Sequence, residues 1–345
     1  MRKTVLMAVA IWVSTLGCTV LADNHTLIVS DQRGSTIYEL DPASFKILNQ
    51  LKTDGQHEMA VSPDGKTIFA SIPEGGYVLI IDATTFKEKG RIESEYFKKT
   101  PVVIPAAEGR PARTDTSARL HGLALNTDGS KLYITVEDAD IPGVVVYDVK
   151  SGKVTKKIDI LLSGGNILQI QPGTDKLYYP LRGDNRLVVI DTKNNDKILK
   201  IIKIEGGPRG IGFTPNGEVW TSQDFSSTVT VVDSKKDEVI KRFATGGHLC
   251  DRLAVSPDGR WAAVTSGVGS HDVAIIDITK KETVARVPTG RGPAFPLFSR
   301  DSSQIYVMSE GEGDIAVVDV KARKVTARHK LFVGPFAASF RSTGD

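Results

Sequence analysis

The sequence predicts an all-β fold, a seven-bladed β-propeller built from four-stranded antiparallel blades. Two series of repeated positions predict it, and each series has seven members. One is an Asp that ends an apolar, β-branched run: Asp41, Asp82, Asp148, Asp191, Asp233, Asp277 and Asp319. The other is the first residue of the strand leading into a Ser-Pro-Asp-Gly-like turn: His57, His121, Asn166, Arg209, Asp251, Ala294 and Phe336. A sheet of four short strands cannot bury its faces alone, so neighbouring repeats must pack on one another.

The stretch that begins at His57 illustrates one repeat. Its elements are, in order, a strand at 57–61, a Ser-Pro-Asp-Gly turn at 62–65, strands at Thr67–Ser71 and Tyr77–Ile81, and a fourth strand after Asp82. An Asp in the position of Asp82 can accept hydrogen bonds from the backbone N–H groups of the next turn. The seven Asp residues are therefore interpreted as turn residues rather than as active sites.

The two ends of the chain are expected to meet in one blade. The first repeat, Thr26–Leu51, lacks a leading strand, and the last segment, Phe336–Arg341, is a leading strand with nothing after it. Pairing of the C-terminal strand into the N-terminal blade would close the ring and remove a free sheet edge.

Residues 1–22 have the layout of a secretory signal peptide. Arg2 and Lys3 precede an apolar run, and Val20-Leu21-Ala22 ends the segment with a cleavage pattern. The apolar run is too short for a comfortable bilayer span, so a retained anchor is disfavoured. Cys18 partly fits a lipidation site, which is the alternative. We predict a periplasmic or secreted protein with one domain, residues 23–345, and no membrane span after cleavage.

The net charge and the cysteine content limit which partners and which disulfides the protein can have. Loss of the signal peptide takes the formal net charge from +3 to +1, because residues 1–22 hold two basic and no acidic side chains. A nearly neutral domain is not expected to bind nucleic acid. Cys250 remains as the single cysteine, so no internal disulfide is expected, and a small buried thiol is its ordinary role. We expect a monomer.

Several repeats resemble a known family. The runs Ala60–Lys66 (AVSPDGK), Ala254–Arg260 (AVSPDGR) and Asp314–Asp319 (DIAVVD) are similar to YVTN-type β-propeller repeats. The resemblance covers nearly the whole chain after residue 25 and implies the propeller fold. Similar repeats occur in surface-layer-like proteins, in periplasmic binders, in lactonase-like enzymes and beside haem or quinone enzymes, so the fold alone does not choose a function.

The second series predicts the place of a functional site. In a propeller the innermost strand of each blade lines the axial channel, so these residues should form a ring around one channel mouth. Neighbouring polar residues add to the ring, and concave sites with convergent polar groups are the default place for a ligand. The ligand-binding candidates are His57, Glu58, His121, Asn166, Arg209, His248, Asp251 and Arg252.

One interval departs from the repeat. Asp82 and Asp148 stand 66 positions apart, against 41 to 44 for the other intervals, and the extra segment is about 93–119. It joins the outer strand of one blade to the inner strand of the next, which predicts that it emerges on the face of the ring. Long insertions are often lids or binding loops. Its basic side chains would favour an anionic ligand over that mouth.

Three kinds of chemistry fit the ring. A metal could use His57 and His121 with Asp251 or His248. A hydrolase could use a His as general base with Arg209 or Arg252 at an oxyanion. A non-catalytic site could bind an anionic molecule, a tetrapyrrole or a partner through Arg and His contacts.

We favour the third kind of chemistry, since it needs the fewest unproven distances. The sequence lacks a Cys-x-x-Cys-His motif, so covalent c-type haem is excluded, and no cofactor is identified. The predicted function is an exported binding or accessory protein that holds a small molecule or a periplasmic protein at the channel mouth. A lactonase-like hydrolase is the alternative, and a metal- or haem-associated redox accessory protein is the second alternative. Whether the protein is an enzyme stays open.

Overall fold

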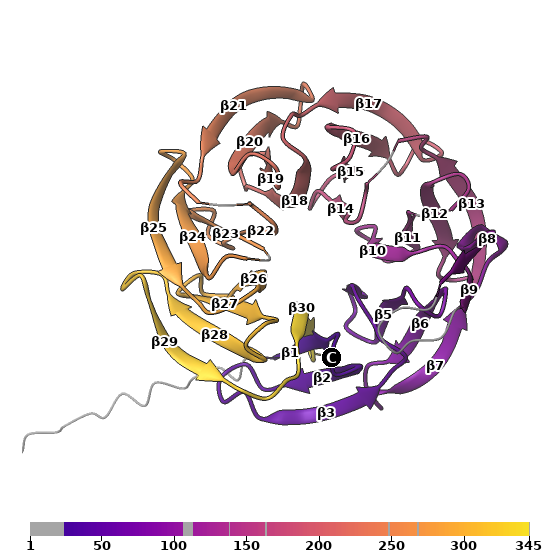
Figure 1. Cartoon of the computed structure of the whole chain (residues 1–345), viewed down its shortest axis with the longest axis horizontal. Coiled ribbons are helices and arrows are strands. Elements are labelled where there is room, and N and C mark those ends of the chain that lie inside the picture. Colours follow the sequence, from indigo (N-terminus) through magenta and orange to yellow (C-terminus); the bar gives the residue numbers. More distant parts are fainter. Residues whose placement is uncertain are drawn as a thin grey trace, which may run out of the picture.

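Seven four-stranded antiparallel sheets form a ring around a central channel (Figure 1). This computed structural model describes residues 24–105, 113–137, 139–162, 164–247, 249–267 and 269–344. It confirms the predicted seven-bladed β-propeller. The segment predicted as a signal peptide lies outside the described residues.

The blades follow the chain, and within each blade the strands are ordered from the channel outward. Blade 1 contains β30 (Pro335–Ser342), β1 (His25–Asp31), β2 (Thr36–Leu40) and β3 (Ile47–Lys52). Blades 2 and 3 contain β4 (Met59–Val61), β5 (Thr67–Ile72), β6 (Tyr77–Asp82) and β7 (Lys87–Ile92), then β10 (Leu120–Leu125), β11 (Lys131–Val136), β12 (Gly143–Asp148) and β13 (Lys153–Asp159). Blades 4 and 5 contain β14 (Gln169–Ile170), β15 (Lys176–Leu181), β16 (Arg186–Asp191) and β17 (Lys197–Lys203), then β18 (Pro208–Phe213), β19 (Glu218–Gln223), β20 (Thr228–Asp233) and β21 (Glu238–Ala244). Blades 6 and 7 contain β22 (Leu253–Val255), β23 (Trp261–Thr265), β24 (Asp272–Asp277) and β25 (Glu282–Pro288), then β26 (Pro293–Phe298), β27 (Gln304–Ser309), β28 (Asp314–Asp319) and β29 (Lys324–His329).

The core lies between blades rather than within them. The two middle strands of a blade are buried on both faces, as in β12, where five consecutive residues are buried. Trp220 of blade 5 is fully buried in a cluster that includes Ala262 and Val264 of blade 6. The outermost strands, such as β3, are mostly exposed. Burial between neighbours therefore explains the unbroken apolar runs in the middle strands.

The repeated Asp residues are turn residues, as predicted. In all seven, Oδ1 accepts a hydrogen bond from the backbone N–H three positions later: Ser44, Thr85, Ser151, Asn194, Lys236, Lys280 and Ala322. The carboxylate thus satisfies a donor at the turn into the outermost strand.

Polar contacts at the outer turns hold consecutive blades together. Lys131 and Tyr133 of blade 3 both reach Asp196 of blade 4, at 3.2 Å from Nζ and 2.7 Å from the hydroxyl. The equivalent Lys176 and Tyr178 of blade 4 reach Asp237 of blade 5 at 2.6 and 3.1 Å. Between blades 5 and 6 the charges are reversed, with Glu218 paired to Lys281 at 2.8 Å. The same position in the repeat thus supplies a contact between blades three times.

The ring closes as predicted. β30 pairs with β1 in antiparallel register from His25↔Ser342 to Asp31↔Pro335, with a shift next to Asp31. The carboxylate of Asp31 accepts the backbone N–H groups of Val333 at 3.0 Å and Gly334 at 2.7 Å. The C-terminal strand is therefore the innermost strand of the N-terminal blade.

The ring has two faces. The mouth face is the one on which the innermost strands begin, and the turn face carries the Ser-Pro-Asp-Gly-type turns. Gly65 in the first of these turns has φ +68°, and a Cβ there would lie 2.1 Å from the carbonyl oxygen of Ser342. The turn face of blade 2 thus packs against the end of β30, and glycine is required at this position.

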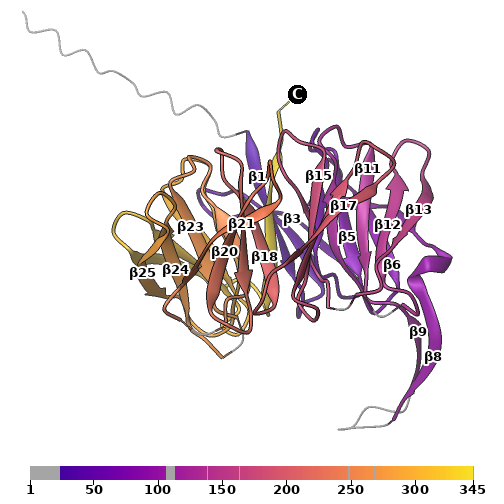
Figure 2. The same cartoon turned by 90° about the horizontal axis from the view of Figure 1, so that it is seen from above.

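The insertion forms a short 3₁₀ helix, η1 (Glu95–Phe97), and a two-stranded hairpin of β8 (Lys98–Ile104) and β9 (Arg113–Ser117). Figure 2 shows it projecting on the side opposite the C-terminus, which is the predicted mouth face. In both views its strands lie at the outer edge of the ring, next to β7 and β13 (Figures 1 and 2). The described strands therefore do not cover the channel mouth, contrary to the expectation of a lid, and 106–112 at the tip lie outside the described residues.

No helix in the described part of the chain is long and apolar enough to cross a membrane.

Candidate functional site

The seven positions of the second series lie at, or within three residues of, the start of the innermost strand in seven different blades. His57 precedes β4, Arg209 is the second residue of β18, and Asp251 precedes β22. The ring predicted around one mouth is therefore present. His248 falls outside the described residues.

Two imidazoles stack at this mouth. The rings of His57 and His121, from neighbouring blades, have centroids 4.5 Å apart and planes inclined by 26°. Phe336 of blade 1 packs on His57 with centroids 4.3 Å apart. Nδ1 of His121 lies 3.0 Å from Oε2 of Glu137. Burial is the main cause that holds the pKa of His57 well below its usual value of 6.5, and the nearby His121 and Arg252 lower it further, so His57 is neutral at pH 7.

An ion pair crosses the channel. Nη2 of Arg252 in blade 6 lies 2.8 Å from Oε1 of Glu58 in blade 2. These blades are not neighbours, since blades 7 and 1 stand between them in the ring. The guanidinium also lies 5.3 Å from the centroid of Phe336. Arg252 is only 2% exposed and Glu58 is 8% exposed, so the pair is buried inside the ring.

A chain of alternating charges continues from this pair around the mouth. Nε of Arg252 lies 3.7 Å from Oδ1 of Asp251, and Nε of Arg209 lies 2.9 Å from the same oxygen. Nη1 of Arg209 lies 3.3 Å from Oδ2 of Asp224. Nη1 of Arg182 lies 2.8 Å from that oxygen as well. The shared carboxylates fix the orientation of both outer guanidinium groups.

These charges line a cavity of about 270 Å³ at the mouth. Arg182, Arg209, Asp224, Asp251 and Glu310 form its polar walls. Its apolar walls come from Leu249, Pro293, Ala294 and Phe336. Blades 4, 5, 6, 7 and 1 therefore contribute to one hollow, and its lining combines fixed charges with apolar surface, as small-molecule sites do.

Some buried nitrogen atoms in this cluster make no hydrogen bond to a described residue. They include Nη1 of Arg252 and Nε2 of His121. An unpaired buried polar group costs about 1–3 kcal/mol, and native proteins leave few of them. The interior of the mouth therefore has hydrogen-bonding capacity that water or a ligand can fill.

Asn166 stands apart from this cluster. Its backbone oxygen accepts a hydrogen bond from Thr135 at 3.2 Å. Within the described part of the chain its side chain makes no hydrogen bond or ion pair. Of the predicted candidates, the structure thus brings together His57, Glu58, His121, Arg209, Asp251 and Arg252, but not Asn166.

The metal and haem interpretations gain no support from this geometry. Over the described ranges, no group of three or more His, Cys, Asp or Glu side chains is placed to hold a metal ion. His57 and His121 turn ring faces toward one another, and Asp251 is paired with two arginines. Neither His lines the mouth cavity, so neither is positioned there as an axial ligand or as a general base. The hydrolase and redox alternatives remain predictions.

Cys250 next to the mouth is a buried thiol. It is 1% exposed and packs with Trp220 and Leu253. Burial raises the pKa of its thiol to about 11. The thiol is therefore protonated at neutral pH and has the structural role that the sequence favoured.

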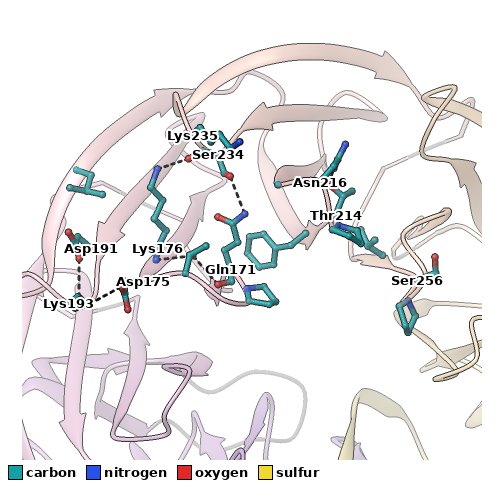
Figure 3. Close-up of a pocket in the computed structure, with 18 of the residues that line it drawn as sticks. Gln171, Asp175, Lys176, Asp191, Lys193, Thr214, Asn216, Ser234, Lys235 and Ser256 are labelled. Atoms are coloured by element: carbon teal, nitrogen blue, oxygen red, sulfur yellow. Dashed lines mark hydrogen bonds and ion pairs between the residues drawn. The ribbon is translucent and has the colours of Figure 1, made fainter.

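A larger hollow, of about 1090 Å³, lies on the turn face between blades 4, 5 and 6. Figure 3 shows Lys176 and Gln171 both reaching Ser234 across its floor. The Lys176 ammonium also binds Asp237 in the contact between blades 4 and 5. The half-buried Lys176 of this hollow therefore holds blades together, which makes the mouth cavity the better candidate site.

Sequence reasoning missed four charged residues of the mouth. Glu137, Arg182, Asp224 and Glu310 each follow directly on the last residue of the second strand in their blades. Turns between the second and third strands return to the mouth face, so this is a second repeated position on the same side. Aligning the repeats on that position would have found them.

Comparisons with known proteins extend the description of the fold. No family model and no curated protein matches the chain, so the resemblance to YVTN repeats stays a prediction. A functionally unknown protein from Desulfotomaculum acetoxidans is similar in structure, with TM-score 0.75 and 13% identity over 91% of this chain and 98% of that one. Hydrazine synthase from Kuenenia stuttgartiensis is similar with TM-score 0.65 and 20% identity, over 81% of this chain and 88% of that one. At these identities the likeness shows that the chain has a β-propeller fold, and no more.

Proposed function

We propose that this protein is an exported, non-catalytic binding or accessory protein that holds a ligand or partner at the channel mouth. The observation that carries the proposal is the mouth cavity, whose fixed arginines and carboxylates come from four different blades. Removing charges from water is costly, and a buried ion pair is poor evidence of added stability. A cluster of charges in a concave site is more often functional than a surface pair.

Export is supported by the sequence at the N-terminus. The expected mature chain begins at Asp23, after cleavage that follows Ala22. N-terminal sequencing of protein produced with residues 1–22 in a bacterial host with a periplasm tests this. An intact Met1 on protein recovered from the cytoplasm would contradict export.

A binding screen tests the mouth. Thermal-shift measurements with a library of small metabolites are made on the wild type and on Arg182→Met. Arg91→Met is the matched control, because each arginine pairs with one carboxylate at 2.8 Å and lies over one aromatic ring. Arg91 lies on β7, the outermost strand of blade 2, and does not line the mouth cavity.

The proposal expects at least one compound that stabilises the wild type and Arg91→Met but not Arg182→Met. Loss of one charged hydrogen bond would weaken such a compound by about tenfold or more. A small-molecule site at the mouth would be refuted if no compound binds, or if every compound that binds stabilises Arg182→Met as much as the wild type.

A further inference from the structure

We propose that the mouth cavity binds a small zwitterion, a molecule of amino-acid size that carries one carboxylate and one ammonium group. The inference rests on the proposed function and names the ligand class of the same site. It follows from three properties of the cavity: free donors, free acceptors and its size.

The hydrogen-bond donors are two arginines whose guanidinium groups are held in place by carboxylates. Arg209 uses Nε for Asp251 and Nη1 for Asp224, and Arg182 uses Nη1 for Asp224. A guanidinium has five N–H groups, so each arginine keeps N–H groups that no described residue accepts. Both side chains line the cavity. Two oriented guanidinium groups are a favourable site for a carboxylate.

The acceptors are three carboxylates that each use one oxygen. Asp251 uses Oδ1 and Asp224 uses Oδ2 for the arginines of the mouth. Glu310 uses Oε1 for Arg33 at 2.7 Å. The second oxygen of each accepts no hydrogen bond from the described part of the chain. These oxygens can accept hydrogen bonds from an ammonium group.

The charges of the lining balance once Arg33 is counted, which pairs with Glu310 without lining the cavity itself. Arg182 and Arg209 offset Asp224 and Asp251, and Arg33 offsets Glu310. A ligand with a single net charge would leave one charge uncompensated in a partly buried site, which is unfavourable. A zwitterion adds one charge of each sign and keeps the balance, so the charges favour it over a simple anion.

The size of the cavity and its apolar lining also fit a ligand of amino-acid size. A volume of about 270 Å³ would hold roughly nine water molecules at ~30 Å³ each, so a molecule with the nine heavy atoms of leucine fits in it. Leu249, Pro293 and Phe336 give the cavity an apolar surface. An aliphatic or aromatic side chain on the ligand would contact this surface.

The test uses named probes. The twenty common L-amino acids, β-alanine, 4-aminobutyrate and glycine betaine are screened by thermal shift, and any binder is measured by titration calorimetry at pH 7. The best binder is then compared with analogues that lack one charge. For L-leucine these are 4-methylpentanoate, without the ammonium, and 3-methylbutylamine, without the carboxylate.

We expect at least one zwitterion to bind, and each single-charge analogue to bind about tenfold more weakly or worse. Arg182→Met and Asp224→Asn should each weaken the zwitterion by a similar factor, and Arg91→Met should leave its affinity unchanged. The inference is overturned if no zwitterion binds. It is also overturned if an analogue without the ammonium group, such as 4-methylpentanoate, binds as tightly as the zwitterion. A non-zwitterionic compound that depends on Arg182 would refute this ligand class while leaving the proposed function intact.

Discussion

Arg252 is buried among charged and aromatic side chains at the mouth. Its guanidinium is buried, bridges the channel to Glu58 and contacts Asp251 and Phe336. A buried cation is tolerated only while its carboxylate partners are present. The stability of the inner channel should therefore be sensitive to Glu58.

Glu58→Gln should destabilise the protein by about 3–5 kcal/mol, because it leaves a buried guanidinium without its nearest charge partner. The double variant Glu58→Met with Arg252→Met should cost less than Glu58→Gln, since no uncompensated charge remains. Urea unfolding of the wild type and these variants gives the free energies. Equal losses for the single and double variants would show that the pair is not coupled across the channel.

The lowered pKa of His57 leads us to expect that the stability of the protein depends on pH. Its pKa is lowered in the folded state, mainly by burial, so below pH ~6.5 the unfolded chain binds a proton that the folded chain does not. Stability should therefore fall as pH decreases through this window, by up to about 1.4 kcal/mol per pH unit.

The matched variant is His57→Phe, which keeps a ring between His121 and Phe336. It should lose this part of the slope when unfolding free energies are compared from pH 6.5 to 5. The groups around His57 are His121, Glu58, Arg252, Arg119 and Arg209. An unchanged slope in the variant would show that His57 does not cause the pH dependence.

For single residues, the sequence predicted where the side chains of the mouth lie but not which side chains they contact. The phase of the repeat places His57, Arg209 and Asp251 at one mouth, because each starts an innermost strand. That Glu58 meets Arg252 depends on the reach of two long side chains across the channel between residues 194 positions apart. Such a contact leaves no local pattern in the sequence, and no spacing rule predicts it.

At the scale of elements, the insertion shows what repeat phase can and cannot predict. Its location and face follow from the order of strands, and both are as expected. Its direction does not follow, because it depends on tertiary contacts of β8 with blade 3. The backbone N–H of Thr100 in β8 bonds Asp140 at 3.0 Å, and Lys157 lies 5.9 Å from the ring of Tyr96. These contacts hold the hairpin at the outer edge.

Removing the hairpin should therefore leave the ring intact. Lys98 pairs with Ser117, and the N–H of Ala118 bonds the carbonyl of Phe97 at 2.9 Å, so a short Gly-Ser turn can replace 99–116. Phe97 and Ala118 are buried and must be kept. We expect a change in unfolding free energy within about 1 kcal/mol, since the described side chains of the excised segment are mostly exposed and a shorter loop costs less to close.

The same deletion variant tests whether hairpin and mouth form one site. From the position of the strands we expect any compound that depends on Arg182 to bind the deletion variant as it binds the wild type. Calorimetric titration of both proteins measures this. A loss of affinity in the deletion variant would show instead that the insertion contributes to the site.

At the scale of the whole molecule, closure of the ring makes the two ends of the chain one blade. The repeat count predicted this because a propeller with an unpaired leading strand and an unpaired trailing unit has two free sheet edges. The pairing joins residues as far apart as His25 and Ser342. Each of the seven blades then has a neighbouring blade on both sides.

Deleting 334–345 should sharply lower the melting temperature. The deletion removes the buried Phe336, Ala337 and Ala338 and leaves the inner edge of β1 unpaired. Burial of one Phe alone contributes about 1.5–3 kcal/mol, and each lost kcal/mol lowers the melting temperature of a large domain by roughly 2–4 °C. With the lost strand pairing included, the decrease should be on the order of 10 °C or more.

Two controls separate loss of closure from a general effect of truncation. Deleting only Gly344 and Asp345, beyond the end of β30, should leave the thermal transition unchanged. A synthetic peptide of residues 333–343, added in excess to the long deletion variant, should raise its melting temperature with peptide concentration, because it binds only the folded ring. Scrambling the peptide should abolish the rescue. A long deletion that melts like the wild type would show that the strand from Pro335 to Ser342 does not hold the ring closed.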